Sequence, residues 1–200
     1  MDSIETTDER ELVDRLRRRE EAAFEHVIRS YGGRLRAVAF RLLRNDSDAD
    51  DAVQEGFLSA YRAIESFEGR SLLSTWLHRL VINAALMRLR KRSRWQETSL
   101  EEELLPAFRG KGVHARHLSR WSETPDGAAE RTELCTWVRE TIDQLPESQR
   151  TLLILRDLEE LSNQEIAELF DLTPNAAKIR VHRARQALRT LLEPRFVSER

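Results

Sequence analysis

The C-terminal part of the chain contains two helical patterns separated by a very short break. The first begins at Ser162, and Glu165 follows at the S-x-x-E spacing in which a hydroxyl and a carboxylate together cap a helix. The second begins at Thr173-Pro174, a capping residue followed by proline at the first helical position. Two capped helices joined by a tight turn predict a helix-turn-helix, whose second helix lies in the major groove of DNA.

The second of these helices is basic on the face opposite its apolar stripe. No acidic residue lies between Leu172 and Leu192. Its apolar residues fall on one stripe at helical spacing, and they are Ala177, Val181, Ala184, Leu188 and Leu191. The opposite face carries Asn175, Ile179, His182, Arg183 and Gln186, with Lys178, Arg185 and Arg189 on one flank and Arg180 on the other.

Individual side chains on this face suit particular contacts with DNA. Arg183 has the planar donors that make two hydrogen bonds to a guanine, and Ile179 has the apolar surface that packs on a thymine methyl group. The flanking cations suit phosphates, which position a helix without reading the base sequence. A solvated basic face on an ordinary bundle helix is the alternative interpretation.

The N-terminal half contains three further helical patterns, which we expect to share one core. The first runs from Glu20 to Arg44, with a kink or break allowed at Gly32-Gly33 because each glycine costs about 1 kcal/mol relative to alanine. Its apolar stripe consists of Phe24, Val27, Ile28, Tyr31, Leu35, Val38 and Leu42.

The other two patterns also carry start signals. Ser47 and Asp50 predict a capping box for the second helix, whose stripe consists of Val53, Phe57, Ala60 and Ile64. Ser71 is the predicted cap of a third helix that runs to about Arg92. Its stripe consists of Leu72, Trp76, Leu80, Ala84 and Met87.

The chain as a whole is predicted to be all-α, with two small helical domains joined by a flexible linker. Residues 95–130 lose periodicity and contain glycine and proline signals, which are typical of a linker. Periodicity returns at Leu134, Val138 and Ile142, and Leu145-Pro146 predicts a helix stop and restart. The predicted boundaries are an N-terminal segment 1–19, domains 20–94 and 131–194, and a tail 195–200. Seven glycines and five prolines are too few for an all-β chain.

The formal net charge is only -2, but the charge is unevenly distributed. Five cations fall within residues 88–94, whereas residues 46–55 are rich in carboxylates, which indicates separate surfaces for a polyanion and for another partner. Cys135 is the only cysteine, so no intramolecular disulfide forms and a reducing compartment is expected. The acidic N-terminus and the absence of a long apolar run argue against a signal peptide and membrane insertion, and predict a cytoplasmic protein.

Two separate sets of motifs resemble those of one known family. Residues 48–61 (DADDAVQEGFLSAY), 67–83 (FEGRSLLSTWLHRLVIN) and the basic run 88–94 resemble region two of bacterial RNA polymerase sigma factors. Residues 145–150 (LPESQR), 161–167 (LSNQEIA) and 178–185 (KIRVHRAR) look like region four. With no counterpart of regions one and three, the whole resembles the extracytoplasmic function (ECF) group of the sigma-70 family. Leu73 stands where the family often has an aromatic residue, and Met87 where aspartate is common.

The resemblance implies a non-catalytic subunit that gives core RNA polymerase its promoter specificity. Region two then binds the β′ clamp helices and the -10 element, and region four binds the -35 element and the β flap. The linker then runs toward the RNA exit path. The family alone suggests an anti-sigma factor as a further partner.

The resemblance also assigns site residues. The expected -35 contacts are Thr173, Asn175, Lys178, Ile179, Arg180, His182, Arg183 and Arg185. Where the promoter duplex melts, a loop over residues 67–73 is expected to bind a base flipped from the non-template strand, because unstacked bases need aromatic and cationic partners. The expected -10 contacts are Phe67, Arg70, Ser71, Trp76, Asn83, Arg88, Arg90, Lys91 and Arg92. Taken alone, Trp76 is more typical of a core tryptophan than of a DNA contact, and the alternative for the basic run is a solvated helix end.

The expected polymerase contacts lie on the second helix of the N-terminal domain. They are Asp50, Asp51, Gln54, Phe57 and Tyr61. The alternative for Asp50 and Asp51 is a solvated acidic helix start that the helix dipole stabilises.

Two other classes of protein fit the sequence less well. An enzyme is disfavoured, because the sequence has no phosphate-binding glycine loop, no G-x-S-x-G and no suitable carboxylate pair. A free-standing regulator with the same helix-turn-helix is the alternative, although such proteins usually dimerise and no dimerisation heptad is present. No cofactor or metal is expected, since His114, His117 and Cys135 are too sparse for a zinc site.

Overall fold

The computed structural model describes residues 3–92, 134 and 136–197, and within them it contains helices and turns but no strand. This confirms the all-α prediction. The chain forms two compact units, Met1–Thr98 and Ser99–Arg200. No helix in the described residues is long and apolar enough to cross a bilayer. The predicted linker 95–130, with His114 and His117, lies outside the described residues, as does Cys135.

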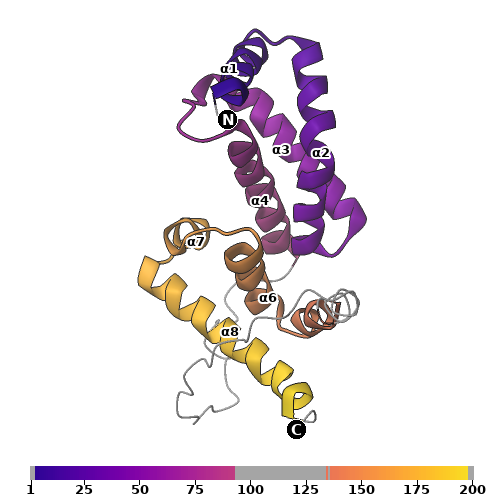
Figure 1. The fold of residues 1–200 in the computed structure, drawn as a ribbon, viewed down its shortest axis with the longest axis vertical. Helices are drawn as coiled ribbons and strands as arrows, with labels where there is room; N and C mark the ends of the chain where they lie inside the picture. The colour runs from indigo at the N-terminus through magenta and orange to yellow at the C-terminus, as the bar shows by residue number, and fades with distance from the viewer. Residues whose placement is uncertain (1–2, 93–133, 135, 198–200) are drawn as a thin grey trace. The chain divides into compact units, whose positions relative to one another are not determined.

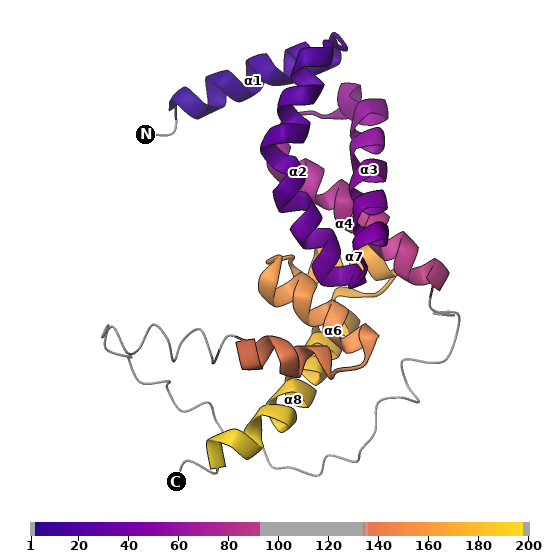
Figure 2. The same ribbon diagram turned by 90° about the vertical axis from the view of Figure 1, so that its right-hand side faces the viewer.

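The N-terminal unit is a bundle in which α2, α3 and α4 pack along one another (Figure 1). Its elements are α1 (Ser3–Arg17), α2 (Glu21–Leu43), α3 (Asp46–Ala63), the short 3-10 helix η1 (Ile64–Ser66) and α4 (Leu73–Arg92). Helix α1 runs crosswise at the end of the bundle where α2 begins (Figure 2). The sequence patterns did not predict α1, yet Val13 and Leu16 on it are buried.

Helix α2 is continuous through Gly32-Gly33, so the break that the glycines allowed does not occur. Apolar burial on both sides of the pair, at Val27 and Leu35, outweighs the weak helix propensity of glycine. Ile28, predicted in the core stripe, is 49% exposed.

Helix α3 presents its smallest residues to the core, which differs from the prediction. The buried positions are Ala49, Ala52, Gly56 and Ala60, while Val53 and Phe57 are only half-buried. The reason is close helix packing, since a Cβ placed on Gly56 would lie 2.5 Å from Cγ2 of Val81 on α4. Small side chains let two helices approach in this way.

The predicted capping box of α3 is wrong. Asn45 is the N-cap, with φ -144° and ψ 127°, and its side chain accepts a hydrogen bond from the Asp48 N–H. The helix therefore begins at Asp46, before Ser47 could act as a cap. Asparagine at this position satisfies one of the free N–H groups of the first turn.

Helix α4 buries a broader surface than the predicted stripe, of which Ala84 is buried and the two end residues are exposed. Leu72 and Met87 are 55% and 58% exposed. The side chains that are buried include Leu73, Leu77, Val81, Ile82, Ala84, Ala85, Leu86 and Leu89. A helix that packs against both α2 and α3 is apolar on most of its circumference, so the helical period does not select one stripe. Ser71 is not its cap, because the Ser71 hydroxyl donates to the Leu72 carbonyl.

The C-terminal unit contains helical residues 136–143, then α6 (Glu147–Leu153), the π-helix η2 (Ile154–Leu158), α7 (Asn163–Phe170) and α8 (Pro174–Val197). Pro146 is the N-cap of α6, which confirms the predicted stop and restart. Leu145, Leu153 and Ala184 form a core cluster against which Leu188 packs. Leu158 at the end of the π-helical turn is 53% exposed.

The contact between Gly56 and Val81 generates a stability prediction. Gly56→Ala forces a methyl group into Val81 and should destabilise the N-terminal unit by about 1–3 kcal/mol. Gly33→Ala is the matched control, because a Cβ there meets nothing within 4 Å. That substitution should stabilise α2 by about 0.5–1 kcal/mol. Chemical denaturation of the two variants measures both effects, and equal free energies of unfolding would contradict the close packing.

Candidate nucleic-acid and partner-binding sites

The helix-turn-helix is capped as the sequence predicts. The Ser162 hydroxyl accepts from the Glu165 N–H at 3.2 Å, and the Glu165 carboxylate accepts from the Ser162 N–H at 2.7 Å. Asp171 ends α7 in the left-handed conformation, and the Thr173 hydroxyl accepts from the Ala176 N–H at 3.2 Å. Local side chains therefore fix where both helices start.

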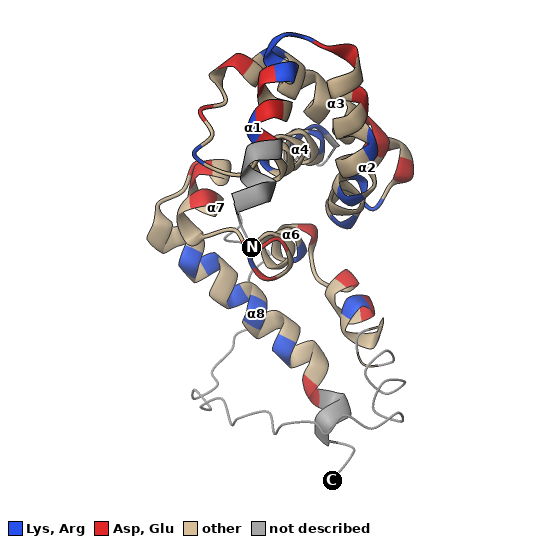
Figure 3. Ribbon diagram, turned by 45° about the horizontal axis from the view of Figure 1, so that its top comes forward, with Lys and Arg blue, Asp and Glu red and all other residues tan. Residues whose placement is uncertain are grey.

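Helix α8 buries one face and exposes the other. Ala177, Val181 and Ala184 are buried, and the cations lie along the helix in Figure 3. Of the expected DNA contacts, Arg180 is half-buried, and the exposed ones are Thr173, Asn175, Lys178, Ile179, His182, Arg183 and Arg185. The seven residues thus share one open surface at the start of a helix.

Arg185 has an intramolecular partner that the sequence did not reveal. Its Nε lies 3.1 Å from Oδ2 of Asp157, and Nη2 contacts Oδ1 of the same carboxylate. The hydrogen bond to Asp157 raises the pKa of Arg185 above the ordinary value of an arginine. Arg156 beside it donates to the Leu161 carbonyl at 2.9 Å. The Arg185–Asp157 pair ties the π-helical turn to α8, and the Arg156 bond ties the same turn to the segment before α7.

The basic end of α4 is partly neutralised by α3. Arg88 Nη1 lies 3.1 Å from Asp51 Oδ2 and 3.8 Å from Asp48 Oδ1. Asn83, Arg90 and Lys91 are exposed, and the side chain of Arg92 is not described. Arg88 therefore connects two helices as well as adding charge.

The loop before α4 places its aromatic residue inward. Phe67 is 5% exposed and packs on Trp76, with ring centroids 5.0 Å apart. Its ring supports the loop from within, so Phe67 does not offer an open face to a base, contrary to the expected role. Gly69 has φ +69°, and Arg70 is exposed and pairs with Glu68 at 2.5 Å.

An apolar hollow of about 730 Å³ opens between α2 and α3. Four of the five residues expected to contact polymerase line it, namely Asp50, Gln54, Phe57 and Tyr61. Asp51 pairs with Arg88 instead. Ile28, Leu58 and Tyr61 line the hollow and are 42–49% exposed. Exposed apolar surface with a polar rim marks interaction sites.

Two further contacts shape one edge of this hollow. Tyr61 packs against Phe24, with ring centroids 5.0 Å apart. The guanidinium of Arg19 lies over the Tyr61 ring at 4.3 Å from the centroid. The ring is thereby held while almost half of it stays open to solvent.

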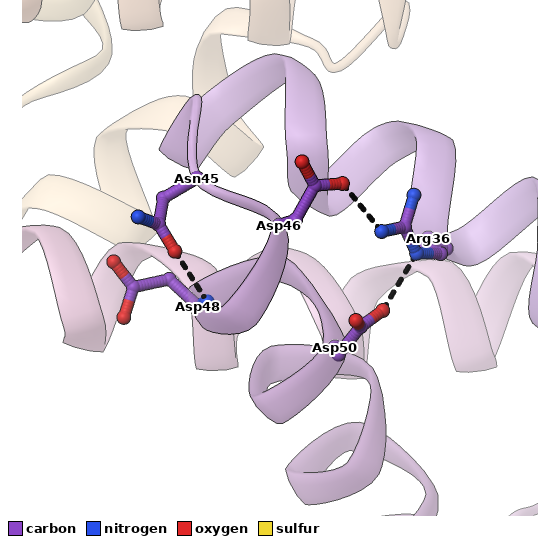
Figure 4. A network of polar contacts seen from close by, with 5 residues as sticks. All are labelled: Arg36, Asn45, Asp46, Asp48 and Asp50. Carbon is purple, nitrogen blue, oxygen red and sulfur yellow. Dashed lines mark hydrogen bonds and ion pairs between the residues drawn. The ribbon is translucent and has the colours of Figure 1, made fainter.

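The acidic start of α3 is held by arginine (Figure 4). Arg36 Nε lies 2.6 Å from Asp50 Oδ1, and its Nη2 lies 2.5 Å from Asp46 Oδ1. The hydrogen bond to Asp50 and, to a smaller extent, the hydrogen bond to Asp46 raise the pKa of Arg36. Together with the Arg88 pairs, these contacts show that the carboxylates are not simply solvated.

One unit thus presents an exposed basic helix in a helix-turn-helix, and the other presents an apolar hollow with a polar rim. Residues 27–94 match the Sigma-70 region 2 family, and residues 135–188 match Sigma-70, region 4. The RNA polymerase sigma-H factor of Pseudomonas aeruginosa is 34% identical over 187 residues, 93% of this chain and 94% of that protein. The ECF RNA polymerase sigma-E factor of Haemophilus influenzae is 34% identical over 92% of this chain and 94% of its own length.

The chain therefore belongs to the sigma-70 family of RNA polymerase sigma factors, in its extracytoplasmic function group. Among solved structures, CnrH in complex with the cytosolic domain of CnrY has a TM-score of 0.53 at 23% identity, covering 93% of this chain and 97% of that one. RpoE from Bartonella quintana, in complex with the anti-sigma factor NepR, has a TM-score of 0.51 at 24% identity, covering 85% and 96%. These likenesses show the shared fold.

The Arg185–Asp157 pair generates a prediction about both stability and binding. In a double-mutant cycle of Asp157→Ala and Arg185→Ala, the coupling in the free energy of unfolding should be about 0.2–1 kcal/mol, because the pair is partly exposed. Asp157→Ala alone removes a carboxylate beside the recognition helix and releases a cation. It should steepen the dependence of log affinity for duplex DNA on log salt by about 0.9. Salt titrations of both single variants check this, and an unchanged slope for Asp157→Ala would argue against it.

Proposed function

We propose that this chain binds core RNA polymerase and directs it to a specific set of promoters, with no catalytic activity of its own. It acts in the cytoplasm, on the nucleoid when bound to polymerase. The observation that carries the proposal is the pair of surfaces in one chain: a capped helix-turn-helix with an exposed basic face, and an apolar hollow rimmed by Asp50 and Gln54.

Helix α8 is proposed to read the -35 element. Its exposed early turns carry Ile179, His182 and Arg183 on the side opposite the buried stripe, the geometry in which a recognition helix meets base edges. Lys178 and Arg180 on the flanks are suited to phosphates. Arg185 contributes mainly by fixing α8 through Asp157.

The N-terminal unit is proposed to dock on the β′ clamp helices and to contact the -10 element. The hollow provides apolar contact area through Phe57 and Tyr61, and the carboxylates of α3 suit a basic partner. The -10 contacts are proposed for Arg70, Ser71, Trp76, Asn83, Arg90 and Lys91. The C-terminal unit contacts the β flap.

An anti-sigma factor is proposed as the regulator of this chain. Exposed apolar side chains such as Ile28 and Leu58 around the hollow offer a surface that an inhibitor can cover in competition with polymerase. The fold is shared with RpoE, whose structure was solved with the anti-sigma factor NepR.

Run-off transcription with purified core enzyme on a genomic promoter library tests the proposal. Specific transcripts that require both core enzyme and this chain are expected, and their start sites supply the promoter motif. A gel-shift assay separates the alternative, because a free-standing regulator binds its operator without polymerase. Specific binding in the absence of core enzyme, with no stimulation of transcription, overturns the proposal.

The recognition helix generates a prediction about promoter discrimination. Arg183→Ala should lower discrimination between the cognate promoter and a -35 variant by about 1–3 kcal/mol, because a bidentate base contact is lost. Lys178→Ala should weaken both promoters equally and reduce the salt slope by about 1. Holoenzyme binding to the two promoters measures these effects, and equal losses for Arg183→Ala would refute its base-reading role.

The hollow generates a prediction about polymerase affinity. Tyr61→Ala should weaken core binding by about 2 kcal/mol, since aromatic residues that become buried on binding are typical hot spots. Met87→Ala is the control, because Met87 is 58% exposed on α4 and does not line the hollow. Competition for labelled core enzyme measures both variants. Similar affinities for the two variants would place the docking surface elsewhere.

A further inference from the structure

Helix α1 lies against the loop that precedes α4. A polar hollow of about 600 Å³ separates them, lined on one side by α1 and on the other by residues 67–72. The α1 residues that line it are Glu9, Arg10, Val13, Asp14 and Arg17. Two of these side chains cross to the loop and bond its backbone, one at each end.

The first contact caps α4 from a distance. The opening N–H groups of a helix have no partner within the helix, and a nearby Ser, Thr, Asp or Asn usually accepts from them. Here Oε1 of Glu9 accepts from the Leu73 N–H at 2.8 Å, across 64 residues of sequence. A carboxylate is well suited to this position, because the N-terminal end of a helix is electropositive.

The second contact holds the other end of the loop. Nη2 of Arg17 donates to the Phe67 carbonyl at 2.8 Å, while its Nη1 pairs with Asp14 at 3.2 Å. Just before the loop, Arg19 donates to the Tyr61 carbonyl and pairs with Glu65 at 3.5 Å. The backbone is therefore bonded by α1 before and after Gly69, which has a positive φ.

We infer that Glu9 and Arg17 are positioning residues that fix the loop 67–72 in the conformation that receives the unpaired promoter strand. The inference rests on the proposed function. Buried Phe67 anchors only the start of the loop, and Gly69 and Arg70 at its tip are exposed, so burial does not order the tip. A loop that is ordered beforehand binds more tightly, because less conformational freedom is lost on binding.

The two side chains act separately from the docking hollow. Neither Glu9 nor Arg17 is among the residues that line the apolar hollow between α2 and α3. Their loss should therefore affect promoter opening and leave core binding intact. A purely structural role in the unit would change both together.

The experiment uses the full chain, core enzyme and a promoter identified by the run-off library. Glu9→Ala and Arg17→Ala are compared with wild type for core affinity, for opening of the duplex promoter by permanganate reactivity, and for holoenzyme binding to a single-stranded oligonucleotide of the -10 non-template sequence. Opening and oligonucleotide affinity should each fall about tenfold, the effect of losing a hydrogen bond to a charged group. Core affinity should stay within about twofold, an effect typical of surface changes away from an interface.

Conservative and matched variants distinguish the hydrogen bonds from general effects of the helix. Glu9→Gln should restore opening, because the amide oxygen accepts the same bond from Leu73. Glu11→Ala removes an acid from an exposed position on α1, and Arg18→Ala removes a base from an exposed position just after α1. Both variants should behave as wild type. Thermal unfolding of each variant confirms that the unit is folded.

Three results would each overturn the inference. The variants could lose core affinity and promoter opening in parallel, they could lose neither, or Glu9→Gln could fail to restore promoter opening. Failure of the proposed function has a different signature. In that case the wild-type chain itself gives no core-dependent transcript, whatever the variants do.

Discussion

The close packing of α3 on α4 at Gly56 and Val81 determines how the N-terminal unit presents its surfaces. Because Gly56 has no side chain, Val81 packs directly against its backbone, and α3 turns its alanines inward and leaves Val53 and Phe57 half-buried on the neighbouring face. That face becomes one wall of the apolar hollow. The same packing brings the start of α3 close enough to α4 for Arg88 to reach Asp51. The hollow and the basic end of α4 are consequently positioned by the same helix packing.

Charge in this protein is used in pairs that join elements as well as in open surfaces. Arg36 connects α2 to α3, Arg88 connects α4 to α3, and Arg185 connects α8 to the π-helical turn. Exposed pairs of this kind add little free energy individually. Their effect is to orient the helices relative to one another within each unit. The exposed side chains of Lys178 and Arg183 are presented by a helix that its neighbours hold in place.

Local signals predicted the all-α fold, the helix-turn-helix and its caps, because Ser162 and Glu165 lie within one helical turn of each other. The face of α3 that enters the core could not be predicted, since it depends on how closely a second helix approaches Gly56. The partners of Leu73 and Arg185 are 64 and 28 residues away, and spacing does not reveal such pairs. Phe67 was expected to contact a flipped base because its chemistry suits stacking, but it is buried and packs on Trp76. The individual promoter and polymerase contacts remain predictions.

The distribution of carboxylate partners at the start of α3 limits how this protein can be re-engineered. Asp46 and Asp50 depend on an arginine of the preceding helix, while Asp48 and Asp51 depend on an arginine of the following one. Replacing α3 alone with the α3 of a relative, to build a chimaera with altered polymerase preference, would remove these acids from beside Arg36 and Arg88. The smallest segment that can be exchanged intact therefore includes Arg36 at one end and Arg88 at the other.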